Sequence, residues 1–304
     1  MIVRPKKNWF SMLFVWNGSV LLSIIPQLLF LAVVSGFAVL TQGRILGEKI
    51  PLNTAPFTLF GVALTIFLAF RNNASYERYK EARHLWGSVL IASRSLTSQV
   101  LCYIHDDRAD RVQLVNGLIA FVYALKHQLR KTDPMQDLNR LLGREAAERL
   151  RSKHYQPIAI LNDIRCKLGR LQLGERTFDT KLWMFDAQIN DLEKTVGGCE
   201  RIASTPIPFS YGVLLHRTVY AYCIMLPFGL VDSTELFTPI ISVFVAYTLI
   251  ALEAIAEEVS EPFSMAPNAL ALDAITRNIE RSLLELCNRE IPEEKVPDPL
   301  YQLT

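Results

Sequence analysis

The sequence has 304 residues, of which 50% are hydrophobic and 20% are charged, and its mean hydropathy is +0.20. Positive hydropathy with this many charges means that apolar and charged segments alternate, as in a membrane protein with a sizeable soluble part. The formal net charge of +2 and the lack of a basic run interleaved with aromatics speak against nucleic-acid binding. The five scattered cysteines lack C-x-x-C spacing, so we expect buried small hydrophobes in a reducing compartment.

Four apolar runs are predicted to be membrane-spanning helices. The first, residues 20–40, has about the 20 residues that a bilayer crossing needs. The second, residues 57–70, is short alone and spans if the residues from Ile50 contribute its first turns. The third and fourth, residues 212–231 and 236–256, are separated by a very short acidic turn. Four crossings place both termini on the same side of the membrane.

The distribution of lysine and arginine predicts which side this is. Basic residues precede the first run and follow the second, whereas the turn at residues 232–235 has none. Because cytoplasmic loops carry an excess of Lys and Arg, we expect both termini and residues 71–210 to be cytoplasmic.

The segment at residues 71–205 is predicted to be helical nearly throughout, because its apolar residues recur at intervals of three and four. A last helix is predicted at residues 270–286. We therefore predict an all-α membrane protein with four transmembrane helices per subunit and a helical cytoplasmic domain. Its parts are an N-terminal segment with helices 1 and 2, a cytoplasmic helical region, helices 3 and 4, and a cytoplasmic C-terminal helix and tail: residues 1–71, 72–208, 209–258 and 259–304.

No catalytic or metal-binding constellation is found in the sequence. His105, Asp106 and Asp107 are adjacent, so their side chains point in different directions and cannot chelate one ion well. No glycine-rich phosphate loop appears, and no Ser or Cys nucleophile has a recognisable partner. We therefore expect no enzyme activity, no cofactor and no metal site.

Four glutamates lie on or beside one face of the fourth helix as it leaves the membrane: Glu253, Glu257, Glu258 and Glu261. One reading pairs them with arginines such as Arg71 and Arg78. The other makes them the lining of a vestibule that attracts cations, and the sequence alone weighs the two equally.

An apolar stripe runs along the second helix, where Val62, Ile66 and Phe70 are four residues apart. Such a stripe usually packs against other helices. If several copies of the helix surrounded an axis, the same side chains would form rings that constrict and dewet a pore. Whether the stripe packs against other helices or lines a pore depends on the oligomeric state.

Three stretches of the sequence resemble one protein family in order and spacing. They are FRNNASYERYKEARHLWG, STPIPFSYGVLLHRTVYAY and IAEEVSEPFSMAPNALALDAITRNIE, at residues 70–87, 204–222 and 255–280. The chain resembles the bestrophins in their bacterial form. The resemblance covers nearly the whole chain.

This resemblance implies a homopentameric ion channel of the bacterial inner membrane, whose partners are its own copies, permeant monovalent ions and membrane lipids. Its single axial pore would be lined by the second helix, with Val62, Ile66 and Phe70 as the hydrophobic neck. By counting back from the Pro-Ile-Pro motif at residues 206–208, Thr180 matches the cytoplasmic aperture, which is usually apolar. The flanking Asp179 would add negative charge.

The resemblance also bears on which ion the channel conducts and on whether calcium regulates it. Animal bestrophins conduct anions, whereas bacterial relatives are associated with monovalent cations. The acidic face and the acidic turn at residues 232–235 favour Na⁺ or K⁺ by simple attraction, and an anion channel is the alternative. Few oxygen donors follow Pro262 and Phe263, so we expect no calcium clasp.

A membrane-anchored scaffold or signalling protein without a pore is the alternative from another class. In that case the stripe of Val62, Ile66 and Phe70 packs against protein or lipid, and the purified protein passes no ions. A secondary transporter is disfavoured, because the four runs contain no pair of broken helices and no inverted repeat.

Overall fold

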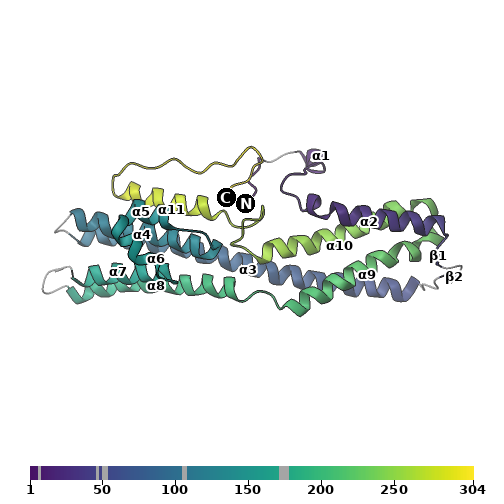
Figure 1. The fold of residues 1–304 in the computed structure, drawn as a ribbon, viewed down its shortest axis with the longest axis horizontal. Coiled ribbons are helices and arrows are strands. Elements are labelled where there is room, and N and C mark those ends of the chain that lie inside the picture. Colours follow the sequence, from purple (N-terminus) through teal and green to yellow (C-terminus); the bar gives the residue numbers. More distant parts are fainter. Residues whose placement is uncertain (6–7, 46–47, 50–53, 105–107, 171–177) are drawn as a thin grey trace. The chain divides into compact units, whose positions relative to one another are not determined.

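The computed structural model describes residues 1–5, 8–45, 48–49, 54–104, 108–170 and 178–304, and these residues are mostly helical (Figure 1). The strands among them are β1 (Arg44–Ile45) and β2 (Glu48–Lys49), which pair antiparallel. The chain forms two compact units. Unit 1 comprises Met1–Val3, Lys80–Thr205 and Pro262–Thr304, and unit 2 comprises Arg4–Tyr79 and Pro206–Glu261.

Unit 2 contains the most apolar helices of the chain. Its helices are α1 (Trp9–Met12), α2 (Leu21–Leu40), α9 (Phe209–Thr234), α10 (Thr238–Ser260) and the first part of α3 (Thr54–Tyr103), with the 3-10 turn η1 (Glu235–Phe237) between α9 and α10. Helices α2, α9 and α10 pack against one another, side by side in Figure 1. Leu31, Leu68, Val219 and Ile250 are buried in their shared core.

Within the described residues, three stretches are long and apolar enough to cross a membrane: Leu21–Leu40, Phe57–Tyr103 and Phe209–Ser260. The third holds both α9 and α10. The predicted run at residues 212–231 lies within α9, and the run at residues 236–256 begins in η1 and continues in α10. The count of four crossings stays a prediction.

Helix α3 is 50 residues long and continues without a break from its apolar first part into its charged second part. The two units meet along the chain inside this helix, after Tyr79. The sequence predicts helix on both sides of Phe70, and this continuity is confirmed.

Unit 1 is a bundle around α4 (Arg108–Arg130). The other helices are α5 (Met135–Leu142), α6 (Arg144–Arg151), α7 (Gln156–Arg170), α8 (Phe178–Ser204), α11 (Leu272–Leu286) and the second part of α3. Helix α4 packs against α5, α7, α8 and α11, and Leu118 to Leu125 are all buried. The helical prediction for residues 71–205 and the last helix are confirmed, apart from residues 105–107 and 171–177, which lie outside the described ranges.

Ion pairs join α11 to α4 and α5 within unit 1. Asp273 accepts hydrogen bonds from Lys126 Nζ at 2.9 Å and from Arg130 Nη1 at 2.6 Å. Glu280, which is 1% exposed, accepts from Tyr123 Oη and Arg140 Nη1, each at 2.6 Å. These contacts satisfy two carboxylates that would otherwise be costly to bury.

The cysteines are only partly as predicted. All five are free thiols, and Cys199 and Cys223 are buried, but Cys102 and Cys166 are exposed and Cys287 is intermediate. Burial raises the pKa of the Cys199 thiol to about 12, so this thiol is unreactive at neutral pH. The expectation of small buried hydrophobes is wrong for the two exposed cysteines, since helix periodicity places them on outer faces.

Candidate functional site

The predicted neck stripe lies on an open face of α3. Val62, Ile66 and Phe70 are 53%, 51% and 61% exposed in a single subunit. At about 100° per residue, these three side chains fall within about 80° of one another around the helix axis. The stripe is therefore left largely uncovered by the helices of its own chain.

The opposite face of α3 is buried. Leu64, Leu68 and Ser75 are 3%, 0% and 0% exposed, and Arg71 is 6% exposed. Leu64 and Leu68 belong to the apolar core with α9 and α10. Residues 62–75 of α3 thus have a packed face and an uncovered face. Arg71 is the only Lys or Arg in this range, and it lies on the packed face.

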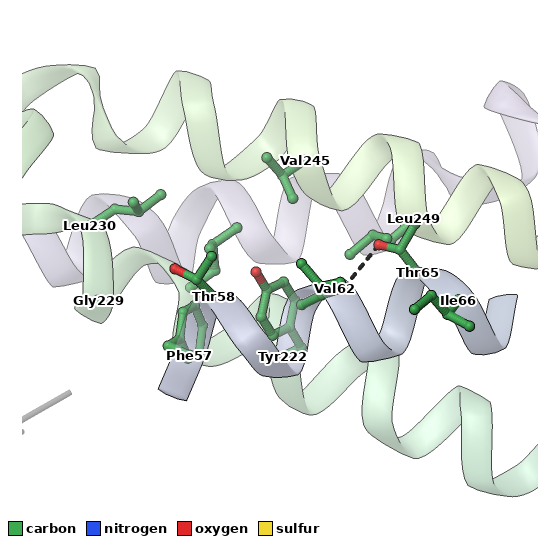
Figure 2. A pocket seen from close by; sticks show the side chains of 12 residues that line it. Phe57, Thr58, Val62, Thr65, Ile66, Tyr222, Gly229, Leu230, Val245 and Leu249 are labelled. Atoms are coloured by element: carbon green, nitrogen blue, oxygen red, sulfur yellow. Dashed lines mark hydrogen bonds between the residues drawn. The ribbon is translucent and has the colours of Figure 1, made fainter. Parts of the chain in front are cut away.

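A groove of about 440 Å³ borders the stripe (Figure 2). Val62 and Ile66 line it from α3, while Tyr222 and Leu230 of α9 and Val245 and Leu249 of α10 line it from the other sides. The lining is predominantly apolar, and its Thr65 hydroxyl donates to the backbone oxygen of Gly61 at 2.9 Å. Within this groove, Val62 and Ile66 therefore stay accessible to apolar groups from outside the subunit.

A close approach between α3 and α9 shapes this groove. The ring of Tyr222 stacks on that of Phe57, with centroids 4.7 Å apart and an interplanar angle of 14°. A Cβ atom at Gly61 would lie 2.5 Å from the Tyr222 hydroxyl oxygen. Glycine is therefore required at this position unless the tyrosine moves.

A network of ionisable side chains lies directly after the stripe. Arg71 Nη1 donates to Glu253 Oε1 at 3.3 Å, and Arg71 Nη2 donates to Glu257. The same Glu253 oxygen contacts His216 Nδ1 at 3.0 Å. The side chains of Arg71 and Glu253 are only 7% and 11% exposed. One buried carboxylate thus connects α3, α9 and α10.

The four glutamates predicted as vestibule charges have different environments. Glu253 is buried and Glu257 keeps a side chain that is 70% exposed, although both bind Arg71. Glu258 is partly buried, and Glu261 is exposed just beyond the end of α10. For Glu253 and Glu257 the ion-pair reading is therefore correct, and lining of a vestibule stays a prediction.

Three further predicted residues are Arg78, a candidate partner of the glutamates, and Thr180 and Asp179 at the predicted aperture. Arg78 donates to the backbone oxygen of Ser260 at 3.0 Å. Thr180 is exposed in the first turn of α8, in unit 1, and its role as an aperture stays a prediction. The side chain of Asp179 lies outside the described residues.

His216 is the residue of this network that sequence reasoning did not connect to a partner. The sequence feature that points to a partner for His216 is its position in an apolar run, because an ionisable group inside a membrane segment usually has a partner or faces water. Among the described residues, no group of three or more His, Cys, Asp or Glu side chains could hold a metal ion. His105, Asp106 and Asp107 lie outside those residues.

Comparison with known proteins identifies the family. The family model described as Bacterial/Fungal Bestrophin protein matches residues 1–285. The Voltage-dependent anion channel-forming protein YneE of Salmonella typhi is 44% identical over 100% of both chains. The Voltage-dependent anion channel-forming protein RSc3414 of Ralstonia nicotianae is 44% identical over 94% of both chains.

A solved structure agrees with these relatives. The crystal structure of a bacterial bestrophin homolog from Klebsiella pneumoniae is 40% identical and superposes with a TM-score of 0.83, covering 88% of this chain and 99% of that one. The relatives are named as channel-forming proteins, which supports an ion channel and agrees with the expectation that the chain is not an enzyme.

The relatives' names disagree with one sequence prediction, the preference for cations. That preference rested largely on the acidic face of α10. Because the positive charge of Arg71 offsets one of the two negative charges on Glu253 and Glu257, the face attracts cations less than its sequence suggests. The matched family model, the relatives and the solved structure together show that the chain is a membrane protein of the bacterial and fungal bestrophin family.

Proposed function

We propose that this chain is the subunit of a homopentameric channel that passes monovalent ions through one axial pore, with a neck made by Val62, Ile66 and Phe70. The observation that carries the proposal is the uncovered stripe on α3. Apolar side chains at this exposure in a membrane helix face lipid, another subunit or a pore. Membership of a family whose members are named channel-forming proteins favours the pore.

The proposal includes the surrounding layout predicted from the sequence. Each subunit crosses the bacterial inner membrane four times, with both termini in the cytoplasm and lipid around the outer helices. Five copies of the stripe form apolar rings, which gate by excluding water at a narrow diameter. Thr180 forms a second aperture, where a hydroxyl wets more readily than an apolar side chain.

The charge of the permeant ion has two supported candidates. Anions are the first, because relatives that are 44% identical over the full length are named anion channel-forming proteins. Cations are the second, because the Glu257 side chain stays 70% exposed despite its ion pair, and Glu261 is also exposed. Exposed carboxylates near a pore mouth raise the local cation concentration.

Reconstitution in planar bilayers with asymmetric NaCl tests the proposal. We expect a current whose reversal potential lies near the chloride or the sodium equilibrium potential and thereby assigns the ion. The double substitution Ile66→Ala with Phe70→Ala widens the apolar rings, so we expect the conductance or the open probability to rise severalfold.

The matched control is Phe30→Ala, which removes an aromatic ring from an exposed position of α2, where Phe30 is 55% exposed. This variant should conduct like the parent. A parent protein that is folded and oligomeric but passes no current would support the scaffold alternative. Equal effects of the neck and control substitutions would place the pore elsewhere.

A further inference from the structure

The position of the Arg71 side chain shows how α3 is rotated about its own axis, and we call this its rotational setting. Arg71 directly follows Phe70 and lies about 100° from it around the helix axis, and the nine-residue step from Val62 to Arg71 places the Val62 and Arg71 side chains about 180° apart. Val62 is 53% exposed and Arg71 is 6% exposed in the same subunit. The face that carries Arg71 is therefore the one that α3 turns toward its own subunit.

The partners of Arg71 make this setting costly to change. A guanidinium with little access to water is tolerated when it is paired, and removing one partner of a buried pair leaves an uncompensated charge. Glu253 is 8% exposed in a single subunit, and neighbouring copies can only bury it further. Rotating α3 in either direction separates Arg71 from Glu253 and breaks the pair between these two buried side chains.

His216 extends this link to a third helix. Its Nδ1 atom contacts Glu253 Oε1 at 3.0 Å, and its ring packs on Tyr220 with centroids 4.4 Å apart. A cavity of about 540 Å³ adjoins these groups, and its lining includes Gln27 of α2 and Arg217 of α9. Glu253 is thus a common acceptor for side chains of α3 and α9, held on α10.

We propose that Glu253 is a positioning residue for the neck: by binding Arg71 and His216 together, it fixes the rotation of α3 that presents Val62, Ile66 and Phe70 on the uncovered face. The consequence for conduction rests on the proposed function. The rotational lock itself is a property of one subunit and is measurable without ion current.

Thiol reactivity measures the rotation directly. Phe70→Cys places a thiol on the uncovered face, and Leu68→Cys places one on the packed face, where Leu68 is 0% exposed. N-ethylmaleimide labelling of the purified oligomer, located by peptide mass spectrometry, gives the ratio of the two rates without removal of the native cysteines. We expect position 70 to react about tenfold faster than position 68, since packing protects the buried thiol.

Substitution of the network should reduce this ratio. With Glu253→Gln we expect the ratio to fall at least severalfold. The exchanged pair Arg71→Glu with Glu253→Arg should restore part of it, because it re-forms this ion pair but loses the contacts with Glu257 and His216. Glu285→Gln, an exposed carboxylate of α11, is the matched control and should leave the ratio unchanged. An unchanged ratio in a folded Glu253→Gln protein would overturn the proposal.

A second variant separates positioning from stability. Arg71→Met with Glu253→Leu removes both charges, and apolar replacement of a buried pair is often neutral or stabilising. We expect this folded variant also to lose the ratio, whereas retention of the ratio would show that apolar packing alone orients α3.

Bilayer recordings on the same proteins keep the two proposals apart. If the parent conducts, Glu253→Gln should change the open probability severalfold and the exchanged pair should recover it. A silent parent whose labelling ratio falls with Glu253→Gln would contradict the channel and support the lock. A conducting parent whose labelling ratio is unchanged by Glu253→Gln would support the channel and contradict the lock.

Discussion

Asp273 shows how unit 1 handles a carboxylate with little access to water. Burial alone raises the pKa of this carboxyl, but hydrogen bonds and charge from Lys126 and Arg130 outweigh burial, and its pKa lies below the usual range. A carboxyl with a lowered pKa stabilises the folded state above its unfolded pKa of about 3.9. That stabilisation is lost as the pH falls through the folded value.

We therefore predict that acid destabilises unit 1 partly through Asp273. The apparent melting temperature of the parent should fall as the pH is lowered from 6 toward 3, and Asp273→Asn should lower it at pH 6 while flattening this dependence. Removing one partner of a mostly buried ion pair costs about 3–5 kcal/mol, less where water reaches the site. Glu285→Gln should keep the parental dependence; an equally steep curve for Asp273→Asn would contradict the assignment.

At the scale of elements, two adjacent glycines of α8 report on how closely it packs against α3 in unit 1. A Cβ atom at Gly198 would lie 2.8 Å from Leu85 Cδ2, whereas a Cβ atom at Gly197 would meet nothing within 4 Å. Gly197→Ala should stabilise the protein by about 0.5–1 kcal/mol, because alanine has the higher helix propensity. At Gly198 the same gain is opposed by displacement of Leu85.

The prediction is a higher melting temperature for Gly197→Ala than for Gly198→Ala, measured by differential scanning fluorimetry in one detergent. The reverse order would mean that Leu85 moves at no cost, or that the exposed face at Gly197 is covered in the oligomer. The substitution is the same at both positions, so each variant is the control for the other.

Helical elements could be predicted well because their periodicity is local. The stripe of Val62, Ile66 and Phe70 follows from spacing alone, and its exposure agrees with that spacing. Ion pairing could not be predicted in the same way. Glu253 is 182 residues from Arg71 and 37 from His216 along the chain, and contact requires the rotational register of three helices. The sequence therefore left pairing and vestibule lining equally weighted.

At the scale of the whole molecule, the proposed pore requires that subunits assemble. We predict that native mass spectrometry in a mild detergent finds five chains of 34.5 kDa each. Reductant should leave this mass unchanged, because all five cysteines are free thiols. A monomeric mass in several detergents would contradict a neck built from rings of Val62, Ile66 and Phe70. A dimer or tetramer would keep self-association but change the diameter of the ring.

The division of unit 1 into three separate stretches of chain has a consequence for biosynthesis. Its α4 and α5 leave the ribosome well before α11, and the chain between them includes α9 and α10, whose stretch is long and apolar enough to cross a membrane. Until α11 arrives, Lys126 and Arg130 lack Asp273, and Arg140 lacks Glu280. We therefore expect Lys126 and Arg130 to wait for their carboxylate partner, so that the bundle of unit 1 is completed only after α9 and α10 have been synthesised.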